Sequence, residues 1–488
     1  MQDPFEEGLK RDFPRGLADT AEAAPLAQWA AASQLQGEAW AWTPQSIFLG
    51  YRGNRRIGPR DDRHFLTVAG SRAGKGISLI IPNLLLYEGS VMAIDPKGEL
   101  ARITKRHRAE KLGHRCFVLD PFDANRRHPS AAFNPLNEID PDSLEAIDDA
   151  ALVADALIVP NLRDPYWTDS AKQMLHGILL YVLTLPEEER TLLTMRQLLI
   201  GTHRLIREVP DDFAHASALE RLWARLISRD DKFDGLAAAI GERFSRTPDK
   251  ELGSIVASAT SQTAFLDSPA LRPVLGRSDF SLADLKERPT TVYLCLPAGR
   301  MGTHARWLRV MVSLALQRLE RQGMHASHQP VLLLLEEFNV LGHMPAVEIA
   351  TGQIAGFGVK IWTVLQDLTQ LQRHYDKAWE TFIGNAGITT AFGNSDVTTL
   401  RYVSEKLGTR SIVVQTASGA SLSARLQGTR GTQENLRVEP LMSPAEFEQA
   451  FARESKRLLV LRPGSPPVVL QRADYSTHPD FAGMFDEP

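Results

Sequence analysis

A glycine-rich stretch near the start of the chain has the residue types that bind phosphate. It reads VAGSRAGKGISL from Val68, and Gly74 and Lys75 match the last glycine and the lysine of the pattern G-x-x-x-x-G-K-[ST]. In such a loop, backbone N–H groups surround the phosphate oxygens, a glycine lets the chain pass close to them, and the lysine adds positive charge. Ala69 replaces the first glycine of the pattern, and Gly76 replaces the final hydroxyl residue. The first change keeps a small residue, whereas the second removes the hydroxyl that ordinarily ligates Mg²⁺.

The flanks of this stretch favour a nucleotide site over a chance glycine-rich turn. Residues 64–69, HFLTVA, read as a buried strand, and the apolar residues after Lys75 continue as a helix that Pro82 should kink or end. Lys75 is the expected catalytic cation of the loop. The residues expected to contact the nucleotide are Ala69, Gly70, Ser71, Arg72, Ala73, Gly74, Lys75, Gly76 and Ile77.

Two acidic residues end the most apolar strand candidate. Four leucines, residues 332–335, are followed directly by Glu336 and Glu337. At the carboxyl end of a central strand, nucleotide-dependent ATPases place an acid that organises Mg²⁺ and a base that polarises water. We assign the metal role to Glu336 and the base role to Glu337, although Glu336 is one methylene longer than the usual aspartate. Taken alone, the pair also fits solvated residues at a strand end.

A third polar residue ends another apolar segment. The strand candidate at residues 359–366 ends in Gln366. An amide at this point can hydrogen-bond both an attacking water and a terminal phosphate, which predicts a catalytic or sensing role. The alternative is an ordinary polar residue where a strand leaves the sheet.

The order of apolar and helical segments predicts an α/β fold with a mostly parallel sheet. Strands are expected at residues 64–69, 90–95, 115–120, 290–297, 330–338, 359–366 and 387–394. Residues 143–285 have helical spacing throughout, with Thr168 or Asp169 as an N-cap. We therefore expect an N-terminal segment at 1–45, a nucleotide-binding domain formed by 46–142 and 286–480, and an all-α domain at 143–285. Residues 418–435 are polar and predict a mobile loop.

The composition limits the partners of the chain. With 55 basic and 59 acidic residues among 488, the net charge is −4, so contact with a polyanion must be local. Cys116 and Cys295 lie far apart and match no disulfide or metal pattern, as expected in a reducing compartment. No signal peptide and no apolar run of about 18 residues is visible, which predicts a soluble chain.

Eight segments together resemble a known family. In their order and spacing, these segments are similar to the TraG class of type IV secretion coupling proteins over roughly residues 46–480. They read AGSRAGKGISLIIPNLL, SVMAIDPKGEL, FNPL, DPYWTDSAKQML, LLLLEEFNVLG, IAGFGVKIWTVLQDLTQL, FIGNAGITTAFGNSDVTT and EPLMSPAEF. Proteins of this class often carry a glycine after the loop lysine and a small residue at its first position, which accounts for Gly76 and Ala69.

The resemblance implies a function. It implies a RecA-like P-loop domain that binds ATP and Mg²⁺, assembles as a homohexameric ring and hydrolyses ATP to drive DNA or protein into a secretion channel. The implied partners are the channel components and single-stranded DNA, with or without a relaxase. The implied location is the cytoplasmic face of the inner membrane. The class usually has a membrane-anchored N-terminus, but residues 1–42 are charged and too short for two spans, so the anchor is either missing or supplied by a partner.

Several residues keep two interpretations. The resemblance implies a structured role near the nucleotide for Asp95, Lys97 and Glu99, whereas a charged turn that caps a helix suits Glu99 better. Tyr166 and Trp167 could stack on bases, although such a pair usually enters the core. Two basic clusters could follow phosphates along a pore or form solvated faces: Arg52, Arg55, Arg56 and Arg60, and Lys105, Arg106, Arg108 and Lys111. His325 and His328 have no partners that complete a metal site.

Other function classes remain open. A small-molecule kinase would need a lid rich in arginines and no helical insertion, which makes it the weakest alternative. A nucleotide-gated receptor that docks secreted proteins suits the acidic balance equally well, and a chromosome-partition or genome-packaging motor shares the fold. DNA-stimulated ATP turnover separates the motor from the docking receptor.

Overall fold

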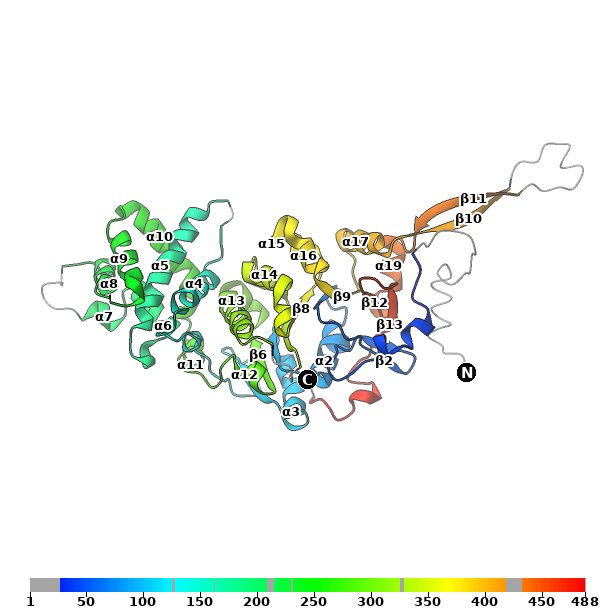
Figure 1. Cartoon of the computed structure of the whole chain (residues 1–488), viewed down its shortest axis with the longest axis horizontal. Coiled ribbons are helices and arrows are strands. Elements are labelled where there is room, and N and C mark those ends of the chain that lie inside the picture. The colour runs from blue at the N-terminus through cyan, green and yellow to red at the C-terminus, as the bar shows by residue number, and fades with distance from the viewer. Residues whose placement is uncertain are drawn as a thin grey trace, which may run out of the picture. The chain divides into compact units, whose positions relative to one another are not determined.

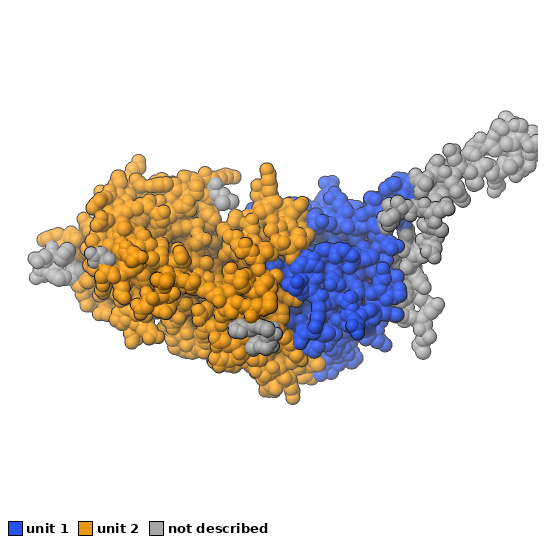
Figure 2. Space-filling view, in the orientation of Figure 1, with its two compact units in different colours: residues 1–87, 365–373, 386–482 blue, residues 88–364, 374–385, 483–488 orange. Residues whose placement is uncertain are grey.

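The structure of the chain is a computed structural model (Figure 1) that describes residues 27–124, 128–161, 163–208, 215–229, 231–324, 329–417 and 432–487. The chain divides into two compact units, coloured separately in Figure 2. Unit 1 comprises residues 1–87, 365–373 and 386–482, and unit 2 comprises residues 88–364, 374–385 and 483–488.

Unit 1 contains a mixed set of strands. The order is β2-β1-β13-β12-β9-β3, in which β3 and β9 are parallel and the other neighbours are antiparallel. Their bounds are β1 (Gly50–Arg52), β2 (Arg55–Ile57), β3 (His64–Ala69), β9 (Ala386–Phe392), β12 (Arg457–Leu461) and β13 (Val468–Gln471). The parallel pair is entirely buried along β3, which explains why four of its six residues are apolar, while His64 and Thr67 are buried polar residues.

Helices and one separate ribbon complete unit 1. A π-helical turn at Gly76–Ile80 leads into α2 (Ile81–Leu86), which has Pro82 in its first turn. The other helices are α17 (Val397–Leu407) and α19 (Pro444–Ala450). Strands β10 (Thr409–Ala417) and β11 (Thr432–Pro440) pair only with each other, as an antiparallel ribbon (Figure 1). Helix α15 (Thr369–Tyr375) begins in unit 1 and ends in unit 2.

Unit 2 contains parallel strands. The order is β8-β7-β4-β6-β5, and all four neighbouring pairs are parallel. Their bounds are β4 (Val91–Asp95), β5 (Arg115–Leu119), β6 (Thr290–Cys295), β7 (Val331–Leu335) and β8 (Val359–Leu365). Every residue of β7 is at most 1% exposed, as expected for a central parallel strand whose two faces are both covered.

The remaining helices of unit 2 fall into two groups. Those near the strands are α3 (Glu99–Glu110), α12 (Asp284–Glu287), α13 (Ala298–Arg321), α14 (Pro345–Gln353) and α16 (Trp379–Gly384). Between residues 143 and 285 the described residues form helices and no strand, and these helices gather into one body (Figure 1). They are α4 (Ala146–Leu157), α5 (Pro165–Leu183), α6 (Leu192–Leu199), α7 (Arg204–Arg207), α8 (Ala218–Ile227), α9 (Leu236–Ser245), α10 (Asp249–Thr263) and α11 (Arg272–Leu275).

Local sequence explains the helical body. Helix α5 is buried at Leu175, Ile178, Leu179 and Val182, the i, i+3, i+4, i+7 spacing of one helix face. Helix α8 starts with a capping box in which Ser217 and Glu220 satisfy each other's backbone N–H groups. Each such cap contributes about 1 kcal/mol to stability.

The structure confirms the predicted α/β class and its mostly parallel strands, because the seven predicted strands correspond to β3 to β9. The predicted N-cap of α5 is wrong. The helix begins earlier, at Pro165 with Asp164 before it, because proline fits the first helical position, where its missing N–H is no loss. Most of the predicted polar loop lies outside the described residues, and Thr432–Asn435 belong to β11 instead. Within the described ranges, no helix is both long and apolar enough to span a bilayer.

Candidate functional site

All the residues predicted to contact nucleotide lie in one connection of unit 1. Strand β3 ends at Ala69, the loop runs from Gly70 to Lys75, and the π-helical turn begins at Gly76. Two loop residues have left-handed backbone conformations, Arg72 at φ 56° and Gly74 at φ 94°. The chain therefore reverses direction tightly between strand and helix, as a phosphate-binding loop requires.

The first glycine of the loop is required by a close backbone contact. A Cβ atom on Gly70 would lie 2.0 Å from the carbonyl oxygen of Gly393, which follows β9. The Gly70 N–H also donates to the Phe392 carbonyl oxygen at 3.4 Å. The loop is thus packed directly against the end of the neighbouring parallel strand, and Ala69 before it is fully buried.

The lysine end of the loop is more open. Lys75 is partly exposed and precedes the helical turn, and a Cβ atom on Gly76 would have no heavy atom within 4 Å. The Ser78 hydroxyl, which is the next one along the chain, donates to the Gly74 carbonyl oxygen at 2.8 Å. Position 76 therefore has room for a side chain with a hydroxyl, although the sequence has glycine there.

Gln366 lies in the same unit as the loop. Its N–H donates to Gln370 Oε1 at 3.0 Å, and its carbonyl oxygen accepts from Asn394 Nδ2 at 3.2 Å. Asn394 is 3% exposed and its backbone nitrogen lies 3.8 Å from where a Cβ on Gly70 would be. Within unit 1, Asn394 therefore connects Gln366 with the loop that follows β3. The sequence placed Asn394 at a strand end but gave no sign of this role.

Glu336 and Glu337 belong to unit 2 and follow β7 directly. Both are half-buried, and Glu337 has a left-handed backbone with φ 54°. This conformation costs a non-glycine residue about 1 kcal/mol or more and is commonest where function holds a side chain in place. The structure thus groups Gln366 with the phosphate loop in unit 1 and keeps the two glutamates in unit 2.

Asp95 is the buried acid at the same strand edge of unit 2. It ends β4, which pairs with β7, and is 1% exposed. Its Oδ2 accepts the Ala101 N–H of helix α3 at 2.9 Å, and burial raises the pKa of its carboxyl to about 6. The N-cap position of α3 is Gly98, and the side chain that accepts an N–H of its first turn is Asp95. Glu99, predicted as the capping residue, instead makes an exposed ion pair with Lys97 at 3.7 Å.

Four arginines of the two basic clusters bond to other groups of the chain. In the first, Arg55 donates to the Leu35 carbonyl oxygen at 3.0 Å, and Arg56 pairs with Asp480 at 2.7 Å. In the second, Arg106 pairs with Asp486 at 2.6 Å, and Arg108 is fully buried. Neither the pore nor the solvated interpretation fits Arg108, because its guanidinium donates inward to Thr291 and Gly89.

At the start of α5, Tyr166 is exposed and Trp167 is half-buried, so the expectation that both are core residues is wrong. Tyr166 is 46% exposed and packs edge-on against the half-buried Trp167, whose Nε1 donates to Asp164 at 3.1 Å. His325 and His328 lie outside the described residues. Within the described part of the chain, no three His, Cys, Asp or Glu side chains cluster as a metal site would need.

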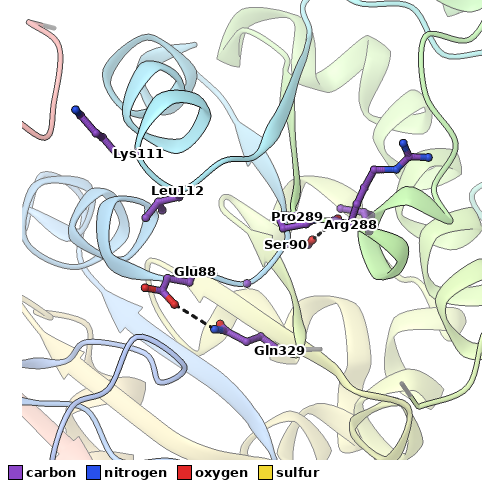
Figure 3. A pocket seen from close by; sticks show the side chains of 9 residues that line it. Glu88, Ser90, Lys111, Leu112, Arg288, Pro289 and Gln329 are labelled. Carbon is purple, nitrogen blue, oxygen red and sulfur yellow. Dashed lines mark hydrogen bonds between the residues drawn. The ribbon is translucent and has the colours of Figure 1, made fainter. Parts of the chain in front are cut away.

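One cavity of unit 2 lies at the opposite ends of the strands (Figure 3). It measures about 350 Å³, and Glu88, Ser90, Pro289 and Gln329 on its wall precede β4, β6 and β7. Glu88 accepts a hydrogen bond from Gln329 at 3.4 Å across this wall. In parallel sheets, nucleotides bind at the carboxyl ends of strands, so this cavity is separate from the predicted chemistry.

The structure defines a mixed α/β protein with a tight glycine-rich connection between β3 and the helix that follows. Residues 29–488 match the family described as Type IV secretory system Conjugative DNA transfer, and the chain belongs to that family.

Individual relatives agree with this assignment. The chain is 28% identical to protein VirD4 of Rhizobium radiobacter over 437 residues, covering 87% of this chain and 58% of VirD4. It is 26% identical to conjugal transfer protein TraG of Escherichia coli over 419 residues, covering 80% of this chain and 62% of TraG. The chain thus spans about three fifths of the length of these curated relatives.

A solved structure shares the fold. Plasmid coupling protein TrwB in complex with the ATP analogue ADPNP superimposes with a TM-score of 0.67 at 14% identity, covering 94% of this chain and 96% of TrwB. TrwB has also been solved in complex with ADP and Mg²⁺.

Proposed function

We propose that this chain is the ATP-hydrolysing motor module of a type IV secretion coupling protein, which recruits DNA, nucleoprotein or protein substrates and drives them into the secretion channel. The observation that carries the proposal is the loop from Gly70 to Lys75, closed against β9 and followed by a helix. Family membership and the ATP analogue bound by TrwB support the same nucleotide class.

Each predicted site residue has a distinct task in this proposal. Lys75 neutralises the phosphates, and the N–H groups of the loop orient them. Glu337 accepts the proton of the attacking water, and Gln366 orients that water through its amide. The Asn394 side chain bonds to the backbone carbonyl oxygen of Gln366 and so holds the chain at that residue, and Glu337 has a left-handed backbone.

Mg²⁺ fits the residues of the chain in part. When bound, Mg²⁺ would neutralise the negative charge that develops during phosphoryl transfer. Glu336 offers a carboxylate oxygen, which is the ligand type that Mg²⁺ prefers. Because Gly76 offers no hydroxyl, the chain supplies fewer Mg²⁺ ligands than the usual loop. Water molecules should therefore supply the remaining ligands.

The larger assembly is part of the proposal. We infer a homohexameric ring, since a nucleotide at the edge of a parallel sheet needs a neighbour's arginine to stabilise phosphoryl transfer. Its partners would be single-stranded DNA, with or without a relaxase, and channel components at the cytoplasmic face of the inner membrane. The DNA-transfer description of the family supports this assignment.

A nucleotide-gated docking receptor for secreted proteins is the second candidate. Two observations favour this candidate. The net charge is −4, and bonds within the chain occupy Arg55, Arg56, Arg106 and Arg108. Local contact with DNA would then depend on other basic residues.

The test is ATP turnover per chain as a function of protein concentration, single-stranded DNA and salt. A ring motor should turn over faster as concentration rises, faster again with DNA, and lose the DNA stimulation as salt rises from about 50 to about 200 mM. ATP turnover that ignores both concentration and DNA would favour the docking receptor. Absence of any ATP turnover under all conditions would reject both ATPase assignments.

A further inference from the structure

An arginine from the last strand of unit 1 reaches the phosphate loop. Arg472 directly follows β13, yet its side chain is buried, with 7% exposed. Its Nη1 donates to the Ala73 carbonyl oxygen at 2.6 Å, and its Nη2 donates to the Arg453 carbonyl oxygen at 2.7 Å. One guanidinium thus joins the loop to the chain that follows α19.

The charge of Arg472 is poorly compensated inside unit 1. Its Nε is buried and makes no hydrogen bond within the described residues, and none of the ion pairs found there includes it. The guanidinium lies 4.4 Å from the ring centre of Phe392, and burial lowers the pKa of Arg472 to about 10, so it remains charged at neutral pH. The exposed carboxylate of Glu454 favours the charge, but it does not form an ion pair with Arg472 among the described residues. A buried cation that lacks a direct carboxylate partner destabilises the folded chain unless another anion approaches it.

The contact with Ala73 also fixes the direction of a loop N–H group. In a trans peptide the C=O and the following N–H point to opposite sides. Because the Ala73 carbonyl points at Arg472, the Gly74 N–H points away from it, out of the interior. Gly74 is close to the same guanidinium, since a Cβ atom there would lie 3.2 Å from Nη1.

The chain after Arg472 holds the other side of the loop. The Tyr475 N–H donates to the Ile77 carbonyl oxygen at 3.4 Å, in the π-helical turn that follows Lys75. Residues 472–475 therefore contact the connection both before and after its lysine.

We propose that Arg472 is a positioning residue of the nucleotide site, which turns the Gly74 N–H toward the phosphates and whose buried charge is balanced when a phosphate anion binds. This inference rests on the proposed nucleotide site. It adds the segment after β13 to that site and predicts that the free chain carries a buried charge that bound nucleotide relieves.

The experiment compares Arg472→Gln, Arg472→Lys, Arg453→Gln and Lys75→Ala with the wild-type chain, using ADP and ATP titrated by calorimetry. Arg472→Gln should lower the affinity for both nucleotides by about tenfold, which is the loss expected for one charge-assisted contact. Without nucleotide, its midpoint of thermal unfolding should stay close to that of the wild type or rise, because the buried charge is gone. The rise in midpoint that ATP produces should shrink.

Arg453→Gln is the matched control, because the Arg453 side chain is exposed and only its backbone carbonyl meets Arg472. Its nucleotide affinity should stay within about twofold of the wild type, since exposed charges are screened. Arg472→Lys keeps the charge without the two-pronged donor and should lose about threefold in affinity. If Arg472→Gln does not fold, this variant decides the question.

If Arg472→Gln binds nucleotide with wild-type affinity, the proposed role of Arg472 is wrong. The same holds for Arg472→Lys if Arg472→Gln does not fold. Loss of nucleotide binding in Lys75→Ala in the same assay would still support the nucleotide site. A purely structural role would lower the unfolding midpoint of the free chain and leave affinity at wild-type values. If the wild-type chain bound neither nucleotide, the proposed function and this inference would both fall.

Discussion

The side-chain amide of Asn394 donates a hydrogen bond to the backbone carbonyl oxygen of Gln366 at 3.2 Å. Asn394 also follows Gly393, whose carbonyl oxygen leaves no room for a side chain on Gly70. One buried asparagine thus lies between the residue expected to orient water and the loop expected to hold phosphate.

Asn394→Ala should therefore slow catalysis more than it weakens binding. Loss of the amide frees the end of β8, so we expect kcat for ATP to fall by about tenfold and the dissociation constant for ATP to change by less than about threefold. Ser395→Ala, at the exposed neighbouring position, is the control and should match the wild type. Equal losses of kcat in the two variants would show that Asn394 does not position Gln366.

The two ends of the loop should respond oppositely to alanine. Gly70→Ala places a Cβ 2.0 Å from a backbone oxygen, so the chain must shift, and we expect a loss of about 1–3 kcal/mol in unfolding free energy together with weaker ATP binding. In Gly76→Ala the new side chain enters open space at a helical position, so the free energy of unfolding should rise by up to about 1 kcal/mol. Urea unfolding of both variants measures the difference. Equal stabilities would mean that the loop is not packed against β9 as described.

Magnesium dependence tests the role of Glu336. Because Gly76 has no hydroxyl, Glu336→Ala should raise the Mg²⁺ concentration for half-maximal ATP turnover by about tenfold. Adding Gly76→Thr to that variant should restore part of the affinity, since the space for a side chain is open. An unchanged Mg²⁺ requirement in Glu336→Ala would place the metal on other residues.

Asp95 should make stability depend on pH. Its folded pKa of about 6 lies above its ordinary value of 3.8, so between these values the folded chain holds a proton that the unfolded chain has lost. Its contribution to stability is therefore full below about pH 4 and is lost as pH rises through about 6. Asp95→Asn lacks this titration. Relative to the wild type, its unfolding free energy should rise by about 1 kcal/mol between about pH 5 and about pH 7.5. A constant difference across that range would contradict the raised pKa.

Long apolar segments were predictable from the sequence. Strands β3 and β7 are buried on both faces, so their segments are largely apolar and stand out in the sequence. The predicted bounds of β3 match the structure, whereas β7 ends at Leu335, three residues before its predicted end. The short strands β1 and β2 were not predicted, because a strand of three residues with half-buried arginines shows no period and is defined by its pairing. β12 and β13 could have been recognised, since two apolar runs flank a Pro-Gly turn at 463–464.

Residue types at the candidate site were predictable, but their surroundings were not. Lys75 and Glu337 stand out because their motifs are local in the sequence. Arg472 and Asn394 reach the loop from more than 300 residues away in the chain, and polar neighbours hide their burial. The exposure of Tyr166 was also misjudged, because nothing in its neighbours shows which side of α5 faces solvent.

The most direct test of the account compares ATP binding and hydrolysis in Lys75→Ala and Glu337→Gln with the wild-type chain. Lys75→Ala should lose ATP binding, because the phosphates lose the loop cation. Glu337→Gln should bind ATP with wild-type affinity and hydrolyse it at least about a hundredfold more slowly, because the water loses its base. Wild-type ATP affinity in Lys75→Ala, or wild-type turnover in Glu337→Gln, would contradict the assignment of this site.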